Sequence, residues 1–203
     1  MKYILLLALT VVIFLFLSRE ELPPAQRLVS QDKILAFGDS LTFGHGVDRE
    51  QSYPAVLAQL SGHPVINEGV SAEASAEGLS RLPAILQNSD AKVMILCYGG
   101  NDILQRRSRE ALRENLIAMI TMAKSRDMQI LLIGVPDISI VGLSTLPLYK
   151  EVAREEGIPY MESMLEDILS DSSLKGDRIH PNALGYHKMA EEIYQALLKY
   201  GIL

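Results

Sequence analysis

The stretch that decides the fold is "KILAFGDSLTFG", residues 33–44, in which a short apolar run passes directly into a Gly-Asp-Ser turn. The run "KILAF" (33–37) is typical of a buried strand, and the residues after the turn favour the start of a helix. Gly, Asp and Ser are ordinary turn and N-cap residues, so this turn alone indicates no function. Its meaning depends on what the rest of the chain places beside it.

Short apolar runs recur along the chain and alternate with amphipathic stretches. The further strand candidates are residues 64–67, 92–98, 129–135 and 158–161. The runs 92–98 and 129–135 are apolar on both alternating faces, as expected of strands that lie between two layers of helices. Strands alternating with helices predict an α/β fold with a mainly parallel, doubly wound sheet.

Three of the predicted helices have clear signals. Ser52 caps one, with Pro54 close to its first turn, and Ser108 begins another. The third follows Pro181. The second helix has an apolar stripe at Leu112, Leu116, Met119, Ile120 and Ala123, and the third has one at Leu184, Met189, Ile193 and Leu197. One-sided stripes of this kind indicate helices that pack against a sheet.

Size, charge and cysteine content limit the classes of function. A chain of 203 residues is long enough for one well-buried domain, and its net charge of −6 argues against a nucleic-acid partner. The single cysteine, Cys97, excludes an internal disulfide. Because it lies in the apolar run "VMILCY", it is predicted to be a buried strand residue rather than a nucleophile.

The amino-terminal segment has the composition of a membrane segment. Residues 3–17 carry no charge and lie between Lys2 and Arg19. As a helix they would be about 22 Å long, which is short for a bilayer core of about 30 Å and close to the apolar region of a secretion signal. No small-x-small cleavage pattern follows, so residues 1–20 are expected to be an uncleaved anchor, with a cleaved signal as the alternative.

The predicted organisation therefore has three parts. Residues 1–20 are the anchor or signal, residues 21–32 with their paired prolines are a tether, and residues 33–203 form the domain. We expect an outward-facing domain at the cell envelope, bound to the membrane through residues 3–17, or periplasmic or secreted if the leader is removed.

Four polar segments follow the predicted strands or precede the last helix. They are Gly38–Ser40, the "NEGVSAEAS" stretch from Asn67, Gly99–Asp102, and Asp177–His180. In doubly wound sheets, sites collect in the loops at the carboxyl ends of the strands. Each segment alone would be an ordinary turn, but their combination predicts one shared site.

Acyl transfer is the chemistry that these residues could support. A serine hydroxyl needs a base within hydrogen-bond reach, and that base needs a third group to orient it. His180 is the candidate base for Ser40, and Asp177 could fix the histidine tautomer from three residues away. A helix that starts at Ser40 would supply backbone N–H donors for an oxyanion, and Asn101 would add a side-chain donor.

These segments resemble the SGNH hydrolases, also called the GDSL esterase/lipase family. The blocks "FGDSLTFG", "NEGVSAEAS", "YGGND" and "DRIHPN" match over residues 33–200, and "GLSRLP" (78–83) is similar to the bacterial periplasmic arylesterase, acyl-thioesterase and lysophospholipase group. The resemblance implies a flavodoxin-like, three-layer α/β/α fold with a mainly parallel five-stranded sheet. It also implies a catalytic triad of Ser40, Asp177 and His180, with no metal or organic cofactor.

The oxyanion hole implied by the resemblance consists of Ser40, Ala72 and Asn101. At the position of Ala72 the family usually has a glycine whose backbone N–H is a donor. Alanine keeps this N–H, and we expect it to donate. If the backbone there has a positive φ, the methyl group costs about 1–2 kcal/mol and the donor could shift.

The expected function is hydrolysis of carboxylic esters or thioesters through a Ser-His-Asp acyl-enzyme, as in arylesterases, lysophospholipases and thioesterases. The substrate is a small ester or thioester, with lipids included. One alternative is an O-acetylesterase acting on envelope carbohydrate. A second is a non-catalytic, tethered binding protein with the same fold. Acyl chain length, leaving group and oligomeric state stay open.

Two other features of the sequence have open or negative interpretations. Two of the histidines His45, His63 and His187 could be combined with Asp39 into a metal site, but their spacing matches no common ligand pattern, so no metal is expected. The loop "PDISIVGLSTLP" (136–147) carries an unusual apolar set of Ile138, Ile140, Val141, Leu143 and Leu146. This loop either packs on the domain or forms an acyl-binding or membrane-facing lip.

Overall fold

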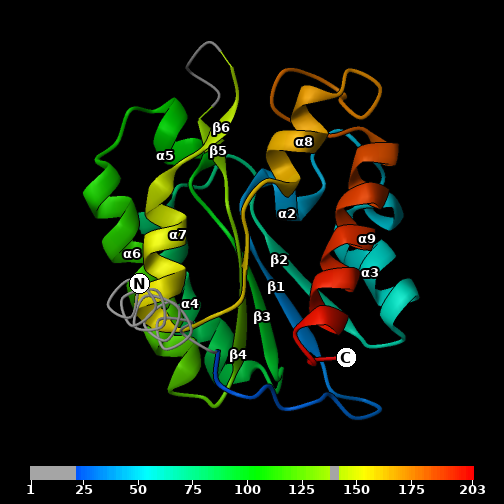
Figure 1. Cartoon of the computed structure of the whole chain (residues 1–203), viewed down its shortest axis with the longest axis vertical. Helices are drawn as coiled ribbons and strands as arrows, with labels where there is room; N and C mark the ends of the chain where they lie inside the picture. Colours follow the sequence, from blue (N-terminus) through cyan, green and yellow to red (C-terminus); the bar gives the residue numbers. More distant parts are fainter. Residues whose placement is uncertain (1–21, 138–141) are drawn as a thin grey trace, which may run out of the picture.

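A computed structural model describes residues 22–137 and 142–203 of the chain (Figure 1). The predictions for residues 1–20, and those for Ile138, Ile140 and Val141 of the apolar loop, lie outside the described residues.

The centre of the domain is a five-stranded sheet with the order β2-β1-β3-β4-β7, in which every pair of neighbours is parallel. Its strands are β1 (Ile34–Gly38), β2 (Val65–Gly69), β3 (Val93–Cys97), β4 (Gln129–Ile133) and β7 (Tyr160–Met161). The predicted α/β fold with a mainly parallel five-stranded sheet is confirmed. All residues of β1 and β3 are buried, Cys97 included, because helices cover both faces of the sheet.

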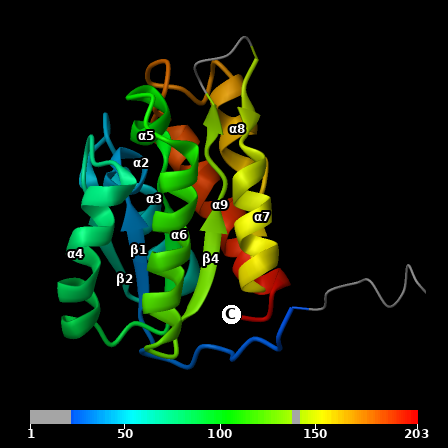
Figure 2. The same ribbon diagram turned by 90° about the vertical axis from the view of Figure 1, so that its left-hand side faces the viewer.

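The helices form the two outer layers. They are α2 (Ser40–Phe43), α3 (Tyr53–Ser61), α4 (Ser75–Asn88), α5 (Gly100–Leu104), α6 (Arg109–Lys124), α7 (Pro147–Glu156), α8 (Met164–Ser170) and α9 (Ala183–Lys199), with a short 3-10 helix η1 (Arg49–Gln51). Helices α4, α6 and α7 cover one face of the sheet, and α3, α8 and α9 cover the other (Figure 2). The domain is therefore a three-layer α/β/α sandwich.

The apolar stripes agree with the predictions, with one exception. The five residues predicted on α6 are buried, as are Met189, Ile193 and Leu197 on α9. Leu184 was predicted to share the α9 stripe, but 67 % of it is exposed. Five residues separate it from Met189, and five steps of about 100° turn its side chain roughly 140° away from the buried face.

The strand predicted over residues 129–135 ends earlier in the structure than the sequence indicated. Strand β4 stops at Ile133, and the chain continues into a two-stranded antiparallel sheet of β5 (Pro136–Asp137) and β6 (Ser144–Thr145). Leu146, just beyond β6, is buried, and Leu143 is half-buried. The described part of the apolar loop thus packs on the domain.

The strand order places a switch point at the centre of the sheet. From β1 the chain moves to β2 on one side and then to β3 on the other. At such a point the connections after the strands diverge, and a crevice forms at their carboxyl ends. The loops after β1 and β3, which carry the Gly38–Ser40 and Gly99–Asp102 segments, therefore meet there.

Residues 22–32, predicted to be a tether, lie against the opposite, amino edge of the sheet (Figure 2). The Gln26 N–H donates to Oε1 of Gln129 (2.9 Å), whose Nε2 donates back to the Gln26 carbonyl (2.6 Å). The Leu28 N–H donates to the Ile202 carbonyl (2.8 Å), and the Leu28 side chain is buried. Among residues 22–137 and 142–203, no helix combines the length and hydrophobicity needed to cross a bilayer.

Candidate active site

Ser40 is the first residue of α2, directly beyond the end of β1. The side chain of Asp39 caps this one-turn helix by accepting a hydrogen bond from the Leu41 N–H (3.0 Å). Gly38 is required because a Cβ there would lie 2.2 Å from Oγ1 of Thr42 and 2.4 Å from the Cys97 carbonyl oxygen. The Gly-Asp-Ser turn therefore combines close approach of the backbone, a helix cap and an accessible hydroxyl.

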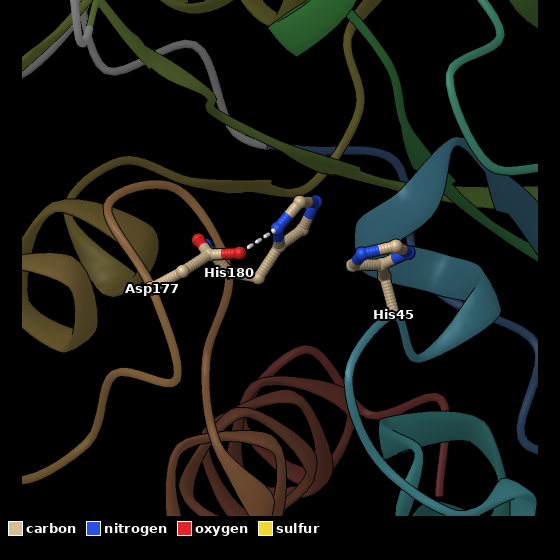
Figure 3. Close-up of side chains that lie close together, drawn as sticks. All are labelled: His45, Asp177 and His180. Carbon is tan, nitrogen blue, oxygen red and sulfur yellow. Dashed lines mark hydrogen bonds and ion pairs between the residues drawn. The ribbon is translucent and has the colours of Figure 1, made fainter.

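His180 lies next to Ser40 although 140 residues separate them in the chain. Its Nε2 is 3.0 Å from Oγ of Ser40, and its Nδ1 is 2.8 Å from Oδ2 of Asp177 (Figure 3). The structure thus brings Ser40, His180 and Asp177 into one hydrogen-bonded series. A carboxylate at Nδ1 favours the tautomer with the proton on Nδ1, which leaves the Nε2 lone pair for the serine hydroxyl.

The carboxylate of Asp177 is held in place by the loop that carries it. Its Oδ1 accepts hydrogen bonds from the N–H groups of Ile179 (2.7 Å) and His180 (2.8 Å). Partial burial would raise the pKa of Asp177, but the hydrogen bonds from the His180 ring and from these two N–H groups outweigh it, so the pKa is lowered. Asp177 is therefore ionised at neutral pH and can stabilise a positively charged imidazole.

Asn101 and Ala72 line the same pocket as Ser40. Asn101 is on α5, and its Nδ2 donates to the Glu73 carbonyl (3.0 Å), with Oδ2 of Asp39 at 3.4 Å. Ala72 has a φ of +63°, so the left-handed conformation considered from the sequence is the one present. Within residues 22–137 and 142–203, neither the Ser40 N–H nor the Ala72 N–H has an acceptor. Both are available to an oxyanion.

A polar network behind Ala72 was not predicted from the sequence. Nε of Arg81 donates to both carboxylate oxygens of Glu73 at 2.9 Å, and its Nη2 donates to the Glu68 carbonyl (2.6 Å) and the Tyr98 hydroxyl (2.9 Å). The Tyr98 hydroxyl in turn donates to Glu73. Burial, and then the bond to Glu73, raise the pKa of Tyr98, so it stays protonated as a donor. Arg81 belongs to the "GLSRLP" stretch, and the similarity of that stretch to one group of the family was the only feature of the sequence that pointed to Arg81.

Asp39 is buried to 99 % and has an unusual protonation equilibrium. Burial raises its pKa to about 7, with further increases from the charges of Asp102 and Glu73, against lowering by the bonds from the Leu41 N–H and Asn101. A far larger share of Asp39 is therefore protonated near neutral pH than of an exposed aspartate.

A pocket of about 210 Å³ opens at Ser40 and His180. Its wall is mainly apolar and includes Leu41, Leu104, Val135, Pro136, Leu169 and Ile179. This volume is below the roughly 300–1,000 Å³ typical of sites for drug-sized ligands. An apolar pocket of this size beside the hydroxyl can hold a short acyl group.

The histidines considered for a metal site are dispersed by the fold. Nδ1 of His63 is bonded to the Asp32 carbonyl (3.0 Å), and His187 lies beside Glu191 on α9. His45 instead lies at the rim of the pocket, where its ring centroid is 4.4 Å from that of His180 (Figure 3). No pattern in the sequence predicted that His45 would lie beside His180.

Comparisons with known proteins place the chain in a family. Residues 36–188 match the model of the GDSL-like lipase/acylhydrolase family. The chain is 27 % identical over 174 residues to the esterase TesA of Pseudomonas aeruginosa, covering 81 % of this chain and 87 % of the relative. It is also 27 % identical over 163 residues to thioesterase 1/protease 1/lysophospholipase L1 of Escherichia coli, covering 77 % and 78 %.

The fold is similar to that of solved relatives. A crystal structure of TesA superposes with a TM-score of 0.74 at 25 % identity, covering 83 % of this chain and 99 % of that chain. Family membership speaks for an enzyme and against the non-catalytic binding protein considered from the sequence. The chain belongs to the GDSL-like lipase/acylhydrolase family, the SGNH hydrolases, and is a carboxylic ester hydrolase.

Proposed function

We propose that this hydrolase cleaves short-chain carboxylic esters or thioesters through an acyl-enzyme on Ser40. The observation that carries the proposal is the unbroken series from Asp177 through His180 to the Ser40 hydroxyl, with contacts of 2.8 and 3.0 Å. The names of the relatives, esterase and thioesterase/lysophospholipase, support the same bond types.

The first half of the reaction forms the acyl-enzyme. Nε2 of His180 takes the hydroxyl proton as Oγ of Ser40 bonds to the substrate carbonyl carbon. The carbonyl electrons move onto oxygen, where the N–H groups of Ser40 and Ala72 can donate to the oxyanion. The Asn101 Nδ2 hydrogen that faces Asp39 at 3.4 Å can turn from that long contact to the oxyanion. The imidazolium then gives its proton to the departing alcohol or thiol as that bond breaks.

The second half releases the acid. Water enters in place of the leaving group, His180 removes its proton, and the resulting oxygen attacks the acyl carbon. Collapse of the second tetrahedral intermediate returns the proton to Oγ of Ser40. No cofactor is consumed in this cycle.

The pocket supports a preference for short acyl chains. Its volume of about 210 Å³ and apolar wall favour a small hydrocarbon group over a sugar ring. Three exposed apolar side chains, Phe43, Val70 and Leu104, follow β1, β2 and β3 at the same edge. A longer chain could extend over them, which keeps lipid esters within the substrate class.

The test combines active-site labelling with a substrate series. A fluorophosphonate probe is expected to label wild-type protein and not Ser40→Ala, and His180→Ala should lower kcat by about 10⁴–10⁶-fold. Rates on p-nitrophenyl esters of about two to sixteen carbons should be highest at the short end. Absence of labelling on folded wild-type protein would contradict the acyl-enzyme. A preference for an acetylated glycan would favour the O-acetylesterase alternative.

We also propose that the domain faces outward at the cell envelope. The uncharged residues 3–17 support this, either as an anchor or as a cleaved signal. Fractionation tests it, because an anchored chain sediments with membranes at full length, and a cleaved one is soluble and shorter. Recovery of soluble full-length protein in the cytoplasm would overturn the proposal.

A further inference from the structure

Three metal-ligating side chains meet at the mouth of the pocket. His45, Asp177 and His180 each offer one ligand atom, and these atoms lie within 4.8 Å of one another (Figure 3). His45 and Asp177 are exposed, so the cluster is accessible from solvent. His45 has no part in the proton transfers proposed above.

We propose that a zinc-like divalent cation binds at His45, Asp177 and His180 and reversibly switches off hydrolysis. Two imidazoles and one carboxylate bind zinc more readily than they bind harder cations such as magnesium or calcium. The inference rests on the proposed function, because two of the three ligands are the proposed base and its orienting group.

Coordination needs only small movements of the three side chains. Ligand bonds of about 2.0–2.2 Å place tetrahedral donor atoms about 3.4 Å apart. Nδ1 of His180 and Oδ2 of Asp177 are 2.8 Å apart, so coordination through these two atoms replaces their hydrogen bond and moves them slightly apart, while the His45 ring moves closer. The His45 backbone is fixed, since its N–H donates to the Ser40 carbonyl (3.0 Å) and its carbonyl accepts from the Tyr186 hydroxyl (3.2 Å). Its exposed ring can turn toward the ion, and water can fill a fourth position.

Either mode of coordination removes the base. A metal on Nε2 of His180 occupies the lone pair that would take the Ser40 proton. A metal on Nδ1 forces the remaining imidazole proton onto Nε2, so the nitrogen that faces Ser40 becomes a donor. In both cases the hydroxyl is left without an acceptor.

The experiment measures inhibition and binding separately, on the full chain in a mild nonionic detergent and a non-chelating buffer. Hydrolysis of p-nitrophenyl acetate is followed against ZnCl₂, with EDTA added at the end, and each variant is normalised to its own metal-free rate. Inhibition of the wild type should be reversed by EDTA. His45→Gln should need at least about tenfold more zinc, because loss of even a supporting partner costs that much affinity. His187→Gln, which removes an exposed histidine of α9, should match the wild type.

Equal zinc sensitivity of His45→Gln and wild type would overturn the proposal, as would full activity of the wild type at about 1 mM zinc, where even weak sites fill. Calorimetry on Ser40→Ala, which keeps all three ligands, separates this inference from the proposed function. One zinc bound there, and lost in Ser40→Ala/His45→Gln, supports the site even if the wild type proves inactive. An active wild type whose Ser40→Ala form binds no zinc refutes the site alone.

Discussion

Asn101 and Glu73 are joined by a hydrogen bond of 3.0 Å from the Asn101 side-chain amide to the Glu73 main-chain carbonyl. This bond connects the loop after β2, which carries Ala72, with the start of α5. The Asn101 amide, one proposed oxyanion donor, is therefore bonded to the residue that follows Ala72, whose N–H is another. The Glu73 side chain is in turn held by Arg81, so the positions of the oxyanion donors depend on residues that are not donors themselves.

Ala72 should tolerate glycine and reject valine. Its φ of +63° costs an alanine about 1–2 kcal/mol, whereas glycine adopts it freely at an unfolded-state entropy cost of about 0.5–1 kcal/mol. We expect Ala72→Gly to keep kcat and to raise the free energy of unfolding by up to about 1 kcal/mol. A β-branched valine should displace the N–H and lower kcat by about 10²–10³-fold. Urea unfolding measures the free energy of unfolding of each variant, and ester hydrolysis measures its kcat. A wild-type kcat in Ala72→Val would exclude this N–H as a donor.

Arg81 should act as a positioning residue for the same loop. Arg81→Met leaves the nearly buried Glu73 carboxylate without its cation, so we expect a loss of about 2–3 kcal/mol in the free energy of unfolding. It should also lower kcat by about tenfold with KM little changed, because the donors lose alignment.

A double-mutant cycle tests the origin of this effect. Adding Glu73→Gln to Arg81→Met should cost less than the sum of the single changes, since no unpaired charge is left. Lys33→Met is the matched control, because its pair with Asp90 is largely exposed and should be worth less than about 1 kcal/mol. Additive losses with an unchanged kcat would show that Arg81 has no positioning role.

Asp39 should make the protein less stable as pH rises from about 4 to 7. Its pKa is about 7 in the folded chain and near 3.8 in the unfolded one, so over this range the folded state binds more protons. The stabilising contribution is complete below pH 3.8 and is lost above about pH 7. A difference of about three pKa units corresponds to as much as about 4 kcal/mol.

Urea unfolding between about pH 4.5 and 8.5, on wild type and Asp39→Asn, measures this dependence. The amide keeps an acceptor for the Leu41 N–H and cannot titrate, so the variant should have a flatter profile. Parallel profiles for the two proteins would mean that Asp39 does not carry a raised pKa.

The fold and the core of the site were predictable because both depend on local patterns. The apolar runs around β1 and β3 indicated buried strands, and parallel strands bring their carboxyl ends to one edge whatever their separation in the chain. This explains Ser40, which follows β1, whereas His180 lies in the loop before α9. His180 was associated with Ser40 because a serine nucleophile needs a base and because "DRIHPN" resembles a block of the family.

The features that escaped prediction depend on lateral contacts and on backbone angles. The φ of Ala72 is set by how the loop after β2 packs, and the contact between the His45 and His180 rings depends on where two unrelated loops end. The contact of Arg81 with Glu73 crosses from α4 to the preceding loop. No periodicity in the sequence reports such contacts, since each is fixed only when the whole domain is assembled.

Residues 22–28 pack along the amino edge of the sheet, so the point where the chain enters the domain and the mouth of the pocket lie at opposite edges. The chain joins the domain at one edge, and the mouth with Ser40 opens at the other, with strands of about 17 Å between them. A support that holds the chain at residue 22 therefore holds the domain by the edge opposite the mouth. Substrate would then arrive from the far side, and immobilisation through the amino end should leave turnover unobstructed.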